Sequence, residues 1–329
     1  MPCFNAEPVL ERTLEDFADQ THRDFELIIV NDGSTDRSEA VAKDFINRKN
    51  LPWKLVTQPN KGISAARNRG MSFAKGEHIV FCDCDDRFEN SYLSELHGKA
   101  VEDGSDAVFC AFDLVNKENI RIKRVKRRKL FFSCEKTGPE LLSRFLLKDR
   151  LAIQMARVLF KTDLLRKNGV TFDENLHNAE DQLFICMALF HAEGVSCIDR
   201  VLYHYVQYPG QSTKSPQKNL TRANVEMRMF GNLVSFLKGN GADEKLTRAI
   251  ENCEVPNAVI KDLSLSLRFG KESYYWEKLG DSECLEKILK TQSVLCFLKK
   301  PETWFKGFEI LHCPKLFLKY YLNKGMAQK

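Results

Sequence analysis

Short apolar runs alternate with amphipathic segments along the first eighty residues, and this alternation limits the folds open to the chain. Residues 8–22 repeat apolar side chains at helical spacing, and residues 25–30 then form an apolar run. The same order continues with a helix to about residue 47 and with further segments at 55–57 (strand), 64–74 (helix) and 77–82 (strand). Strands that alternate with helices in this way are typical of βα units. The sequence predicts a Rossmann-like α/β fold, with a mostly parallel sheet flanked by helices.

Carboxylates gather where one of these predicted strands ends. The apolar run 79–82 leads directly into Asp83, Asp85 and Asp86. Neighbouring carboxylates disfavour one another's ionised form, whereas a hard cation such as Mg²⁺ or Mn²⁺ prefers oxygen ligands. Asp32 also follows a predicted strand, and ligands of parallel sheets bind beyond the carboxyl ends of strands. We therefore expect Asp32 and Asp83 to share one pocket; a solvated acidic turn is the alternative for this motif taken alone.

Composition indicates an ordinary soluble protein. The 329 residues are 43% hydrophobic and 29% charged, and no apolar run reaches the roughly 18 to 20 residues that span a bilayer. No signal peptide is recognisable after Met1, and the eleven cysteines show neither a disulfide framework nor a zinc spacing. Scattered thiols without an export signal favour a reducing compartment, so a cytoplasmic location is expected.

The pattern changes near Ser215-Pro216. Upstream, strands are predicted at about 107–112, 158–160 and 202–206, with helices at about 140–147, 163–168 and 179–192. From about residue 218 the chain is helical in character. We therefore predict a catalytic domain at 1–215 and a helical C-terminal region at 216–329.

Several motifs together resemble those of family 2 glycosyltransferases with the GT-A fold, of the type that builds bacterial cell-surface polysaccharides. The matching blocks are Pro2–Asn5, Gln20-Thr21, Phe25–Asp36, Gln58–Gly70, Phe81–Asp86, Phe172–Glu174 and Glu180–Phe184. Their order and spacing agree over roughly the first 210 residues. Each block alone is a weak signal, but their joint occurrence is specific.

The resemblance implies a nucleotide-sugar donor, with UDP as the expected nucleotide, and assigns residues to it. Asp32 would accept a hydrogen bond from the nucleobase, close to Phe4 and Asn5. Arg67 would reach towards the nucleotide, and Asp83 would hold the ribose. Each residue also has a plainer interpretation: Asp32 lies in an Asn-Asp-Gly turn, and Arg67 could be a solvated helix residue.

The resemblance also implies a divalent metal, Mg²⁺ or Mn²⁺, and a general base. Asp85 and Asp86 are the predicted metal residues, although the sequence cannot divide the work between adjacent carboxylates. Asp181 would remove the proton of the acceptor hydroxyl, with Glu180 in support, and direct displacement by one base predicts inversion at the anomeric carbon. The alternative is that both acids only complement the dipole at a helix N-terminus.

One departure from the family pattern concerns the start of the fold. Relatives carry an apolar strand immediately before the block at Pro2–Asn5, and this chain begins at Met1. The first, central strand is therefore expected to be missing. This leaves open a catalytically degenerate, N-terminally truncated binding protein as an alternative. A nucleotidyltransferase is less favoured, because no glycine-rich loop with lysine or arginine follows the first strand.

Two basic regions bear on partners. The basic run 121–129 could bind a lipid-phosphate-linked acceptor, or it could form the solvated face of a hairpin. Aromatic residues interleaved with lysines at 304–321 suit either peripheral attachment to an anionic membrane or helix packing. The predicted enzyme transfers sugar to a glycan or lipid-linked glycan at the inner face of the plasma membrane, with no role for nucleic acid.

Overall fold

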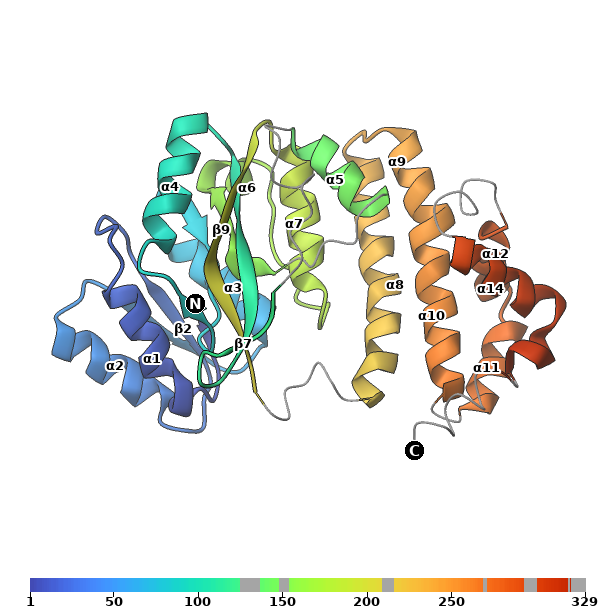
Figure 1. Ribbon diagram of the computed structural model, residues 1–329, viewed down its shortest axis with the longest axis horizontal. Helices are drawn as coiled ribbons and strands as arrows, with labels where there is room; N and C mark the ends of the chain where they lie inside the picture. The colour runs from blue at the N-terminus through green and yellow to red at the C-terminus, as the bar shows by residue number, and fades with distance from the viewer. Residues whose placement is uncertain are drawn as a thin grey trace. The chain divides into compact units, whose positions relative to one another are not determined.

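The computed structural model describes residues 1–124, 137–147, 154–208, 216–268, 271–292, 301–318 and 320. It separates into two compact units, drawn in Figure 1. The first comprises Met1–Leu142 and Ala152–Pro209, and the second comprises Ser143–Leu151 and Gly210–Lys329. The second unit thus includes 143–151, a segment that the sequence analysis placed in the first domain. Residues 125–129 of the basic run lie outside the described residues.

The first unit contains a parallel three-stranded sheet with the order β1-β2-β3. Its strands are β1 (Pro2–Cys3), β2 (Ile28–Asp32) and β3 (Lys54–Gln58). The helices between and after them are α1 (Glu7–Ala18), α2 (Ser38–Lys49) and α3 (Ile63–Phe73). Helices α1 and α2 pack on each other and α3 packs on β2. The predicted βα alternation is therefore confirmed in this half of the unit.

A second sheet of six strands completes the first unit. Its order is β4-β8-β6-β9-β5, with β7 paired to β6, and the pairing is mixed: β6 and β9 are parallel while β4 and β8 are antiparallel. The strands are β4 (His78–Val80), β5 (Arg87–Phe88), β6 (Ala107–Asn116), β7 (Arg121–Arg124), β8 (Val158–Lys161) and β9 (Val195–Gln207). The accompanying helices are α4 (Tyr92–Asp103), α5 (Gly138–Leu147), η1 (Met155–Arg157), α6 (Thr162–Lys167) and α7 (Glu180–His191). Helix α4 packs on β6 and β9.

Large apolar side chains fix α1 and α4 against the sheets. Leu10, Leu14 and Phe17 of α1 are fully buried, and the Phe17 ring lies 4.9 Å from that of Phe88. Tyr92 at the start of α4 is also fully buried, and its hydroxyl donates to the carbonyl of Ala156 at 2.7 Å. This core positions the strand ends that carry the acidic residues.

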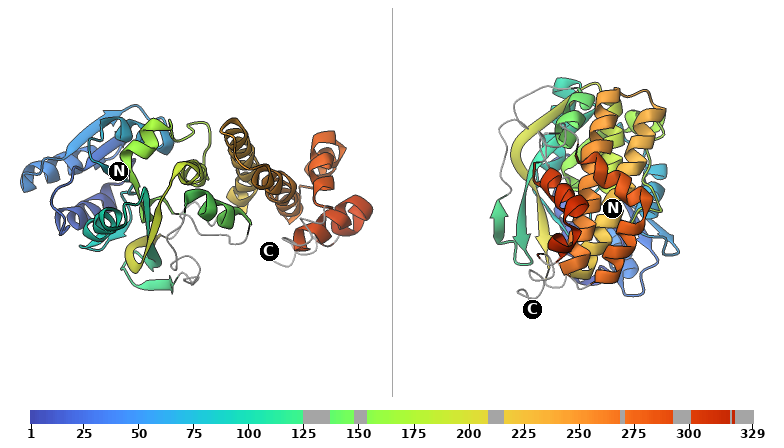
Figure 2. Two further views of the ribbon diagram at one scale, coloured as in Figure 1. Left: turned by 90° about the horizontal axis from the view of Figure 1, so that it is seen from above. Right: turned by 90° about the vertical axis from the view of Figure 1, so that its right-hand side faces the viewer.

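The described part of the second unit consists of helices and the short turns between them, and Figure 2 shows these helices from two further directions. They are α8 (Pro216–Gly239), α9 (Glu244–Ala249), the π-helix η3 (Ile250–Glu254), α10 (Val255–Arg268), α11 (Glu272–Gly280), α12 (Ser282–Lys290) and α14 (Pro301–His312). The buried core includes Leu263, Leu267, Tyr275, Ile288 and Phe317. None of the described helices is long and apolar enough to cross a membrane.

The first strand, expected to be missing, consists of two residues. The Met1 ammonium donates to the Ile28 carbonyl at 2.9 Å, and the Val30 amide donates to the Met1 carbonyl at 2.9 Å. Strand β1 thus begins in parallel register with β2. Within the described residues no strand joins β1 to β4, so the sheet is divided into two parts.

Candidate functional site

Asp32 ends β2 and organises the loop that follows β3. Its Oδ1 accepts from Gln58 Nε2 at 2.8 Å and from the Lys61 amide at 2.9 Å, while Oδ2 accepts from the Gly62 amide at 2.8 Å. Next to it, Gly33 has φ +70°, and a Cβ there would lie 2.7 Å from the Asn60 amide nitrogen. Glycine is therefore required for this close approach. Contact of Asp32 with a nucleobase remains a prediction.

Asn5 ties the loop after β1 to the loop after β2. Its backbone is left-handed with φ 48°, its side-chain oxygen accepts from the Thr35 amide at 2.8 Å, and its own amide donates to Ser34 Oγ at 3.0 Å. The neighbouring Phe4 is 48% exposed. Asn5 thus bonds the loop that carries Phe4 to the loop that follows Asp32.

Arg67 joins the acidic strand end to the start of α7. This buried α3 residue donates from Nη2 to Asp83 at 2.8 Å and from Nη1 to Glu180 at 3.2 Å. Although burial opposes it, the carboxylates of Asp83, Glu180 and Asp181 raise the pKa of the Arg67 guanidinium. The resemblance directed Arg67 to the nucleotide, but in the structure it bridges two predicted site residues. Glu180 Oε2 is also buried, and the described residues give it no hydrogen-bond partner.

Asp86, which the sequence analysis predicted to be a metal residue, is turned towards β9. It is fully buried and accepts from the Tyr203 hydroxyl at 2.6 Å and the Val206 amide at 2.9 Å, both on β9. Burial, together with the charges of Asp85 and Asp83, raises the Asp86 pKa well above its usual range. A carboxylate enclosed by these donors is poorly placed for a metal ion. We therefore assign Asp86 to holding the loop 83–86 against β9.

Further residues that the sequence analysis did not assign hold the same loop. Thr13 Oγ1 on α1 lies 2.9 Å from the carbonyls of both Cys84 and Asp86. Tyr208 donates to the Asp85 carbonyl at 3.2 Å and accepts from Arg12 at 2.7 Å. A polar Thr13 in the apolar stripe of a helix was the available sequence signal. The contacts from β9 have no local signal, because that strand pairs with distant segments.

Asp83 and Asp85 are the carboxylates of this loop that remain partly exposed. The part of the chain that the structure describes contains no group of three or more histidine, cysteine or acidic side chains placed to hold a metal ion. Mg²⁺ often uses only one or two carboxylates and completes its shell with water and phosphate oxygens. Two partly exposed carboxylates therefore fit a metal that is shared with a diphosphate.

Asp181 lies in the first turn of α7 and is partly exposed. Burial, together with the charge of Glu180, raises its pKa to about 7, although Arg67 opposes this. The two residues before α7, Asn178 and Ala179, have left-handed backbones with φ 70° and 75°. Such conformations are costly for a residue with a Cβ and occur often at functional sites. The local backbone therefore sets the direction in which α7 begins.

Comparison with known proteins places this geometry in a family. The family model described as glycosyl transferase family 2 matches residues 1–167. The uncharacterised glycosyltransferase EpsJ of Bacillus subtilis is 31% identical over 220 residues, which cover 66% of this chain and 63% of EpsJ. The poly(ribitol-phosphate) β-N-acetylglucosaminyltransferase TarS of Staphylococcus aureus is 27% identical over 233 residues, 70% of this chain and 38% of TarS. The chain thus spans less than two thirds of the length of both relatives.

Solved structures agree on the fold. A crystal structure of S. aureus TarS residues 1–349 matches with a TM-score of 0.58 at 19% identity, covering 98% of this chain and 87% of that one. A mannosyltransferase from Pyrobaculum calidifontis, solved with GDP-Man and Mn²⁺, matches with a TM-score of 0.56 at 17% identity, covering 100% and 86%. These are GT-A structures, so the predicted fold class is confirmed. With its N-terminal half matched by the family model, the chain belongs to glycosyl transferase family 2.

Proposed function

We propose that the protein is an inverting, metal-dependent glycosyltransferase that moves a sugar from a nucleotide-diphosphate donor to a hydroxyl acceptor. The observation that carries the proposal is the Arg67 bridge from Asp83 to Glu180. It holds the carboxylates at the end of β4 beside the first turn of α7. This bridge supports the proposal that donor-binding and proton-accepting groups from distant parts of the chain share one site.

The donor is proposed to carry UDP. TarS has been solved with UDP and with UDP-GlcNAc, and those structures share the fold of this chain. The exposed Phe4 ring and the Asp32 carboxylate lie on adjoining loops and would receive the base. Asp83, 29% exposed and anchored by Arg67, would receive the ribose hydroxyls.

A bound Mg²⁺ or Mn²⁺ would neutralise charge that develops on the departing diphosphate. Asp85, with Asp83 beside it, would hold the ion. The chain itself fixes these carboxylates in place. Asp86 holds the loop from β9, and Thr13 holds it from α1, so the loop backbone is bonded on two sides.

Asp181 is proposed to accept the proton of the acceptor hydroxyl. The acceptor oxygen forms a bond to the anomeric carbon as the bond from that carbon to the diphosphate oxygen breaks. The proton passes to a carboxylate Oδ of Asp181, and the nucleoside diphosphate leaves with the bonding electrons. One displacement inverts the anomeric configuration. A base of pKa about 7 suits proton transfer near neutral pH.

Assays of nucleotide release with Mn²⁺ test the proposal across UDP-, GDP- and dTDP-linked sugars. We expect a UDP-sugar to be turned over fastest, with release of UDP stimulated by Mn²⁺ and suppressed by EDTA. The alternative to a transferase is a binding protein of the same fold that has lost catalytic activity. UDP binding measured by calorimetry without turnover of any donor would favour that candidate. Pyrophosphate release from a nucleoside triphosphate would instead indicate a nucleotidyltransferase.

The acceptor is proposed to be a glycan or lipid-linked glycan of a cell-surface polysaccharide, reached from the cytoplasmic face of the membrane. TarS is named for transfer to poly(ribitol-phosphate). Peripheral membrane contact is supported by α14, where Phe305 and Phe308 are 55% and 43% exposed on one face. Burying two such side chains in a bilayer interface would be worth about 1.5–3 kcal/mol each.

Flotation with vesicles that contain anionic lipid tests this contact. The double variant Phe305→Ser/Phe308→Ser should lower the bound fraction at least about tenfold, because each lost ring removes buried apolar area. Val101→Ser, which removes a 62% exposed apolar side chain from α4, is the matched control and should leave binding unchanged. Equal flotation of all three proteins would contradict the membrane role of α14.

A further inference from the structure

Two cysteine side chains meet between β1 and the loop 83–86. Cys3 ends β1 and is 2% exposed, whereas Cys84 lies between Asp83 and Asp85 and is partly exposed. Their thiols are hydrogen-bonded to each other, although β1 and the loop come from distant parts of the sequence. Both cysteines are free thiols, and the proposed sugar transfer uses neither.

Helix α1 and the core beneath it keep the two cysteines together. The Cys84 carbonyl lies 2.9 Å from Thr13 Oγ1 on α1. Cys3 belongs to the buried apolar cluster that includes Leu10 and Leu14 of the same helix, and Cys84 packs against that cluster. The backbone of Cys84 and the side chain of Cys3 are therefore both held by α1 and its surroundings. A short approach of the two sulfur atoms is the movement that a bond between them requires.

We propose that Cys3 and Cys84 are a redox modification site, at which a reversible disulfide ties β1 to the loop 83–86 and weakens metal-dependent nucleotide binding. The oxidant is a low-molecular-weight disulfide such as glutathione disulfide. In a reducing compartment such a bond is transient and typical of redox sensing. The pairing of the thiols rests on the structure alone, whereas its effect on the nucleotide rests on the proposed function.

Oxidation takes place in two thiol–disulfide exchanges. The partly exposed Cys84 sulfur attacks one sulfur of the oxidant, which forms a mixed disulfide and releases one small thiol. The Cys3 sulfur then attacks the Cys84 sulfur and expels the second small thiol. The two protein thiols lose two electrons and two protons, and the external disulfide takes up both as it becomes two thiols. An excess of small thiol reverses both steps.

The contact between the thiols also favours the second exchange. The hydrogen bond from Cys84 lowers the pKa of the Cys3 thiol, although burial opposes this shift. The thiolate is the attacking form of a cysteine, so the buried member of the pair is prepared to resolve a mixed disulfide on the exposed one.

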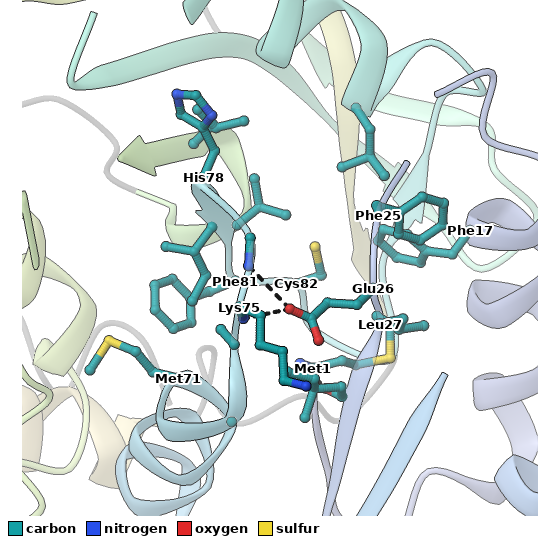
Figure 3. Close-up of a pocket in the computed structure, with 18 of the residues that line it drawn as sticks. Met1, Phe17, Phe25, Glu26, Leu27, Met71, Lys75, His78, Phe81 and Cys82 are labelled. Carbon is teal, nitrogen blue, oxygen red and sulfur yellow. Dashed lines mark hydrogen bonds between the residues drawn. The ribbon is translucent and has the colours of Figure 1, made fainter. Parts of the chain in front are cut away.

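Cys82, two residues before Cys84, has different surroundings. It is 3% exposed, and its sulfur lies 4.0 Å from the Tyr92 hydroxyl. It lines a pocket of about 570 Å³ between β2 and β4, which Figure 3 shows together with Met1 and Phe81. A disulfide that involved Cys82 would require these buried contacts to break. Cys82 therefore serves as an internal control for the pairing.

The disulfide would act on the carboxylates next to Cys84. Its sulfur atoms must lie about 2.05 Å apart, which is closer than any hydrogen-bonded contact. Cys84 must therefore move towards β1, and its immediate neighbours Asp83 and Asp85 move with it. A misplacement of about 1 Å can cost a positioned site about 10²-fold. Oxidation should thus weaken the site proposed to bind the metal ion and the ribose.

Thiol mapping tests the pairing without any assay of sugar transfer. The full chain is treated with glutathione disulfide, both native and in urea, the remaining thiols are alkylated, and linked peptides are quantified by mass spectrometry. In the native protein we expect the Cys3–Cys84 link to exceed every other link at least about tenfold and to disappear with dithiothreitol. In urea this preference should vanish, because closing a long loop is then less favourable than closing a short one.

Matched variants sharpen the mapping. Cys3→Ser and Cys84→Ser should each abolish the link, whereas Cys313→Ser, which alters an exposed cysteine of the second unit, should retain it. The pairing would be overturned if both thiols stayed free in the native protein, or if Cys84 carried only glutathione. A dominant link to Cys82 would overturn it equally.

Calorimetry with UDP and Mn²⁺ tests the consequence. We expect the oxidised protein to bind UDP at least about tenfold more weakly than the reduced protein, with recovery after reduction. Cys84→Ser should show no change on treatment with glutathione disulfide. Equal affinity of the reduced and oxidised forms would overturn the regulatory role. Absence of UDP binding in both forms would contradict the proposed function and the nucleotide effect with it, whereas the disulfide itself is judged by thiol mapping.

Discussion

Replacing Asp181 by asparagine should lower kcat by about 10²–10⁴-fold, the usual contribution of a positioned general base. Asparagine keeps the shape and the oxygen that accepts from the Gln182 amide at 2.8 Å, but it cannot take a proton. UDP affinity should change by less than about twofold. Steady-state kinetics and calorimetry with UDP measure the two quantities. Asp163→Asn, which alters an acid of α6 that pairs with Lys167, is the control.

The pH dependence of kcat/KM in the unaltered enzyme also tests Asp181 as the general base. With a pKa of about 7, Asp181 is protonated and inactive as a base at pH 5 and ionised at pH 8.5. The value of kcat/KM should therefore rise with pH and level off above about 7. Asp181→Asn should abolish this limb. A full pH limb retained in that variant, or activity within tenfold of the unaltered enzyme, would remove Asp181 as the base.

As the pH rises, the contribution of Asp181 to folding stability should fall while the catalytic activity rises. An aspartate with a raised folded pKa binds more protons in the folded than in the unfolded state between the unfolded pKa, about 3.9, and about 7. Folding stability is therefore lost as the pH rises through that window, and the loss is complete by pH 8. Asp181→Asn removes the carboxylate that causes this loss, so at pH 8 the melting temperature of the variant should be no lower than that of the unaltered protein. Low activity then cannot be attributed to unfolding.

Replacing Asp85 by alanine is expected to lower kcat/KM by about 10²–10³-fold. Neutralising developing charge with a metal ion is worth several kcal/mol, and about 1.4 kcal/mol corresponds to a tenfold change in rate. In the presence of EDTA, the variant and the unaltered protein should bind UDP with the same affinity. It should lose the gain in affinity that Mn²⁺ gives, which calorimetry with and without the ion measures directly.

The control for Asp85→Ala is Glu283→Gln in α12, whose carboxylate is 73% exposed and pairs with Lys287. It should leave both activity and the Mn²⁺ effect unchanged. If Asp85→Ala kept full Mn²⁺-stimulated turnover, the ion would have to be held elsewhere or not at all. Equal UDP affinity of all three proteins in EDTA shows that the nucleotide loops are intact.

Local pattern was sufficient to predict most elements of the first unit. The predicted helix at 64–74 is observed as α3 over Ile63–Phe73, and the predicted strand at 107–112 begins β6 at Ala107. Both rest on residue periodicity within one segment. The mixed order of the six-stranded sheet had no such signal. It arises because β6 is bonded to β8 on one side and to β9 on the other, both far along the chain.

The candidate site shows the same limit. Sequence could find the cluster of Asp83, Asp85 and Asp86, but not which carboxylate faces inwards. The answer depends on Tyr203 and Val206, which reach Asp86 from β9. Likewise Arg67 could be recognised as part of a motif, whereas its bridge to Glu180 depends on how α7 packs. Residue type was predictable, and the side to which each residue turns was not.

The divided sheet also bears on how the enzyme would complete a cycle. The loops proposed to hold the base follow β1 and β2, whereas the carboxylates proposed to hold the ribose and the metal ion follow β4 in the other sheet. A movement that opens the pocket between β2 and β4 would separate these loops from these carboxylates, and both groups are proposed to bind the same nucleotide. Release of spent nucleoside diphosphate, often the slow step of such enzymes, would then be governed by the bonds across that opening.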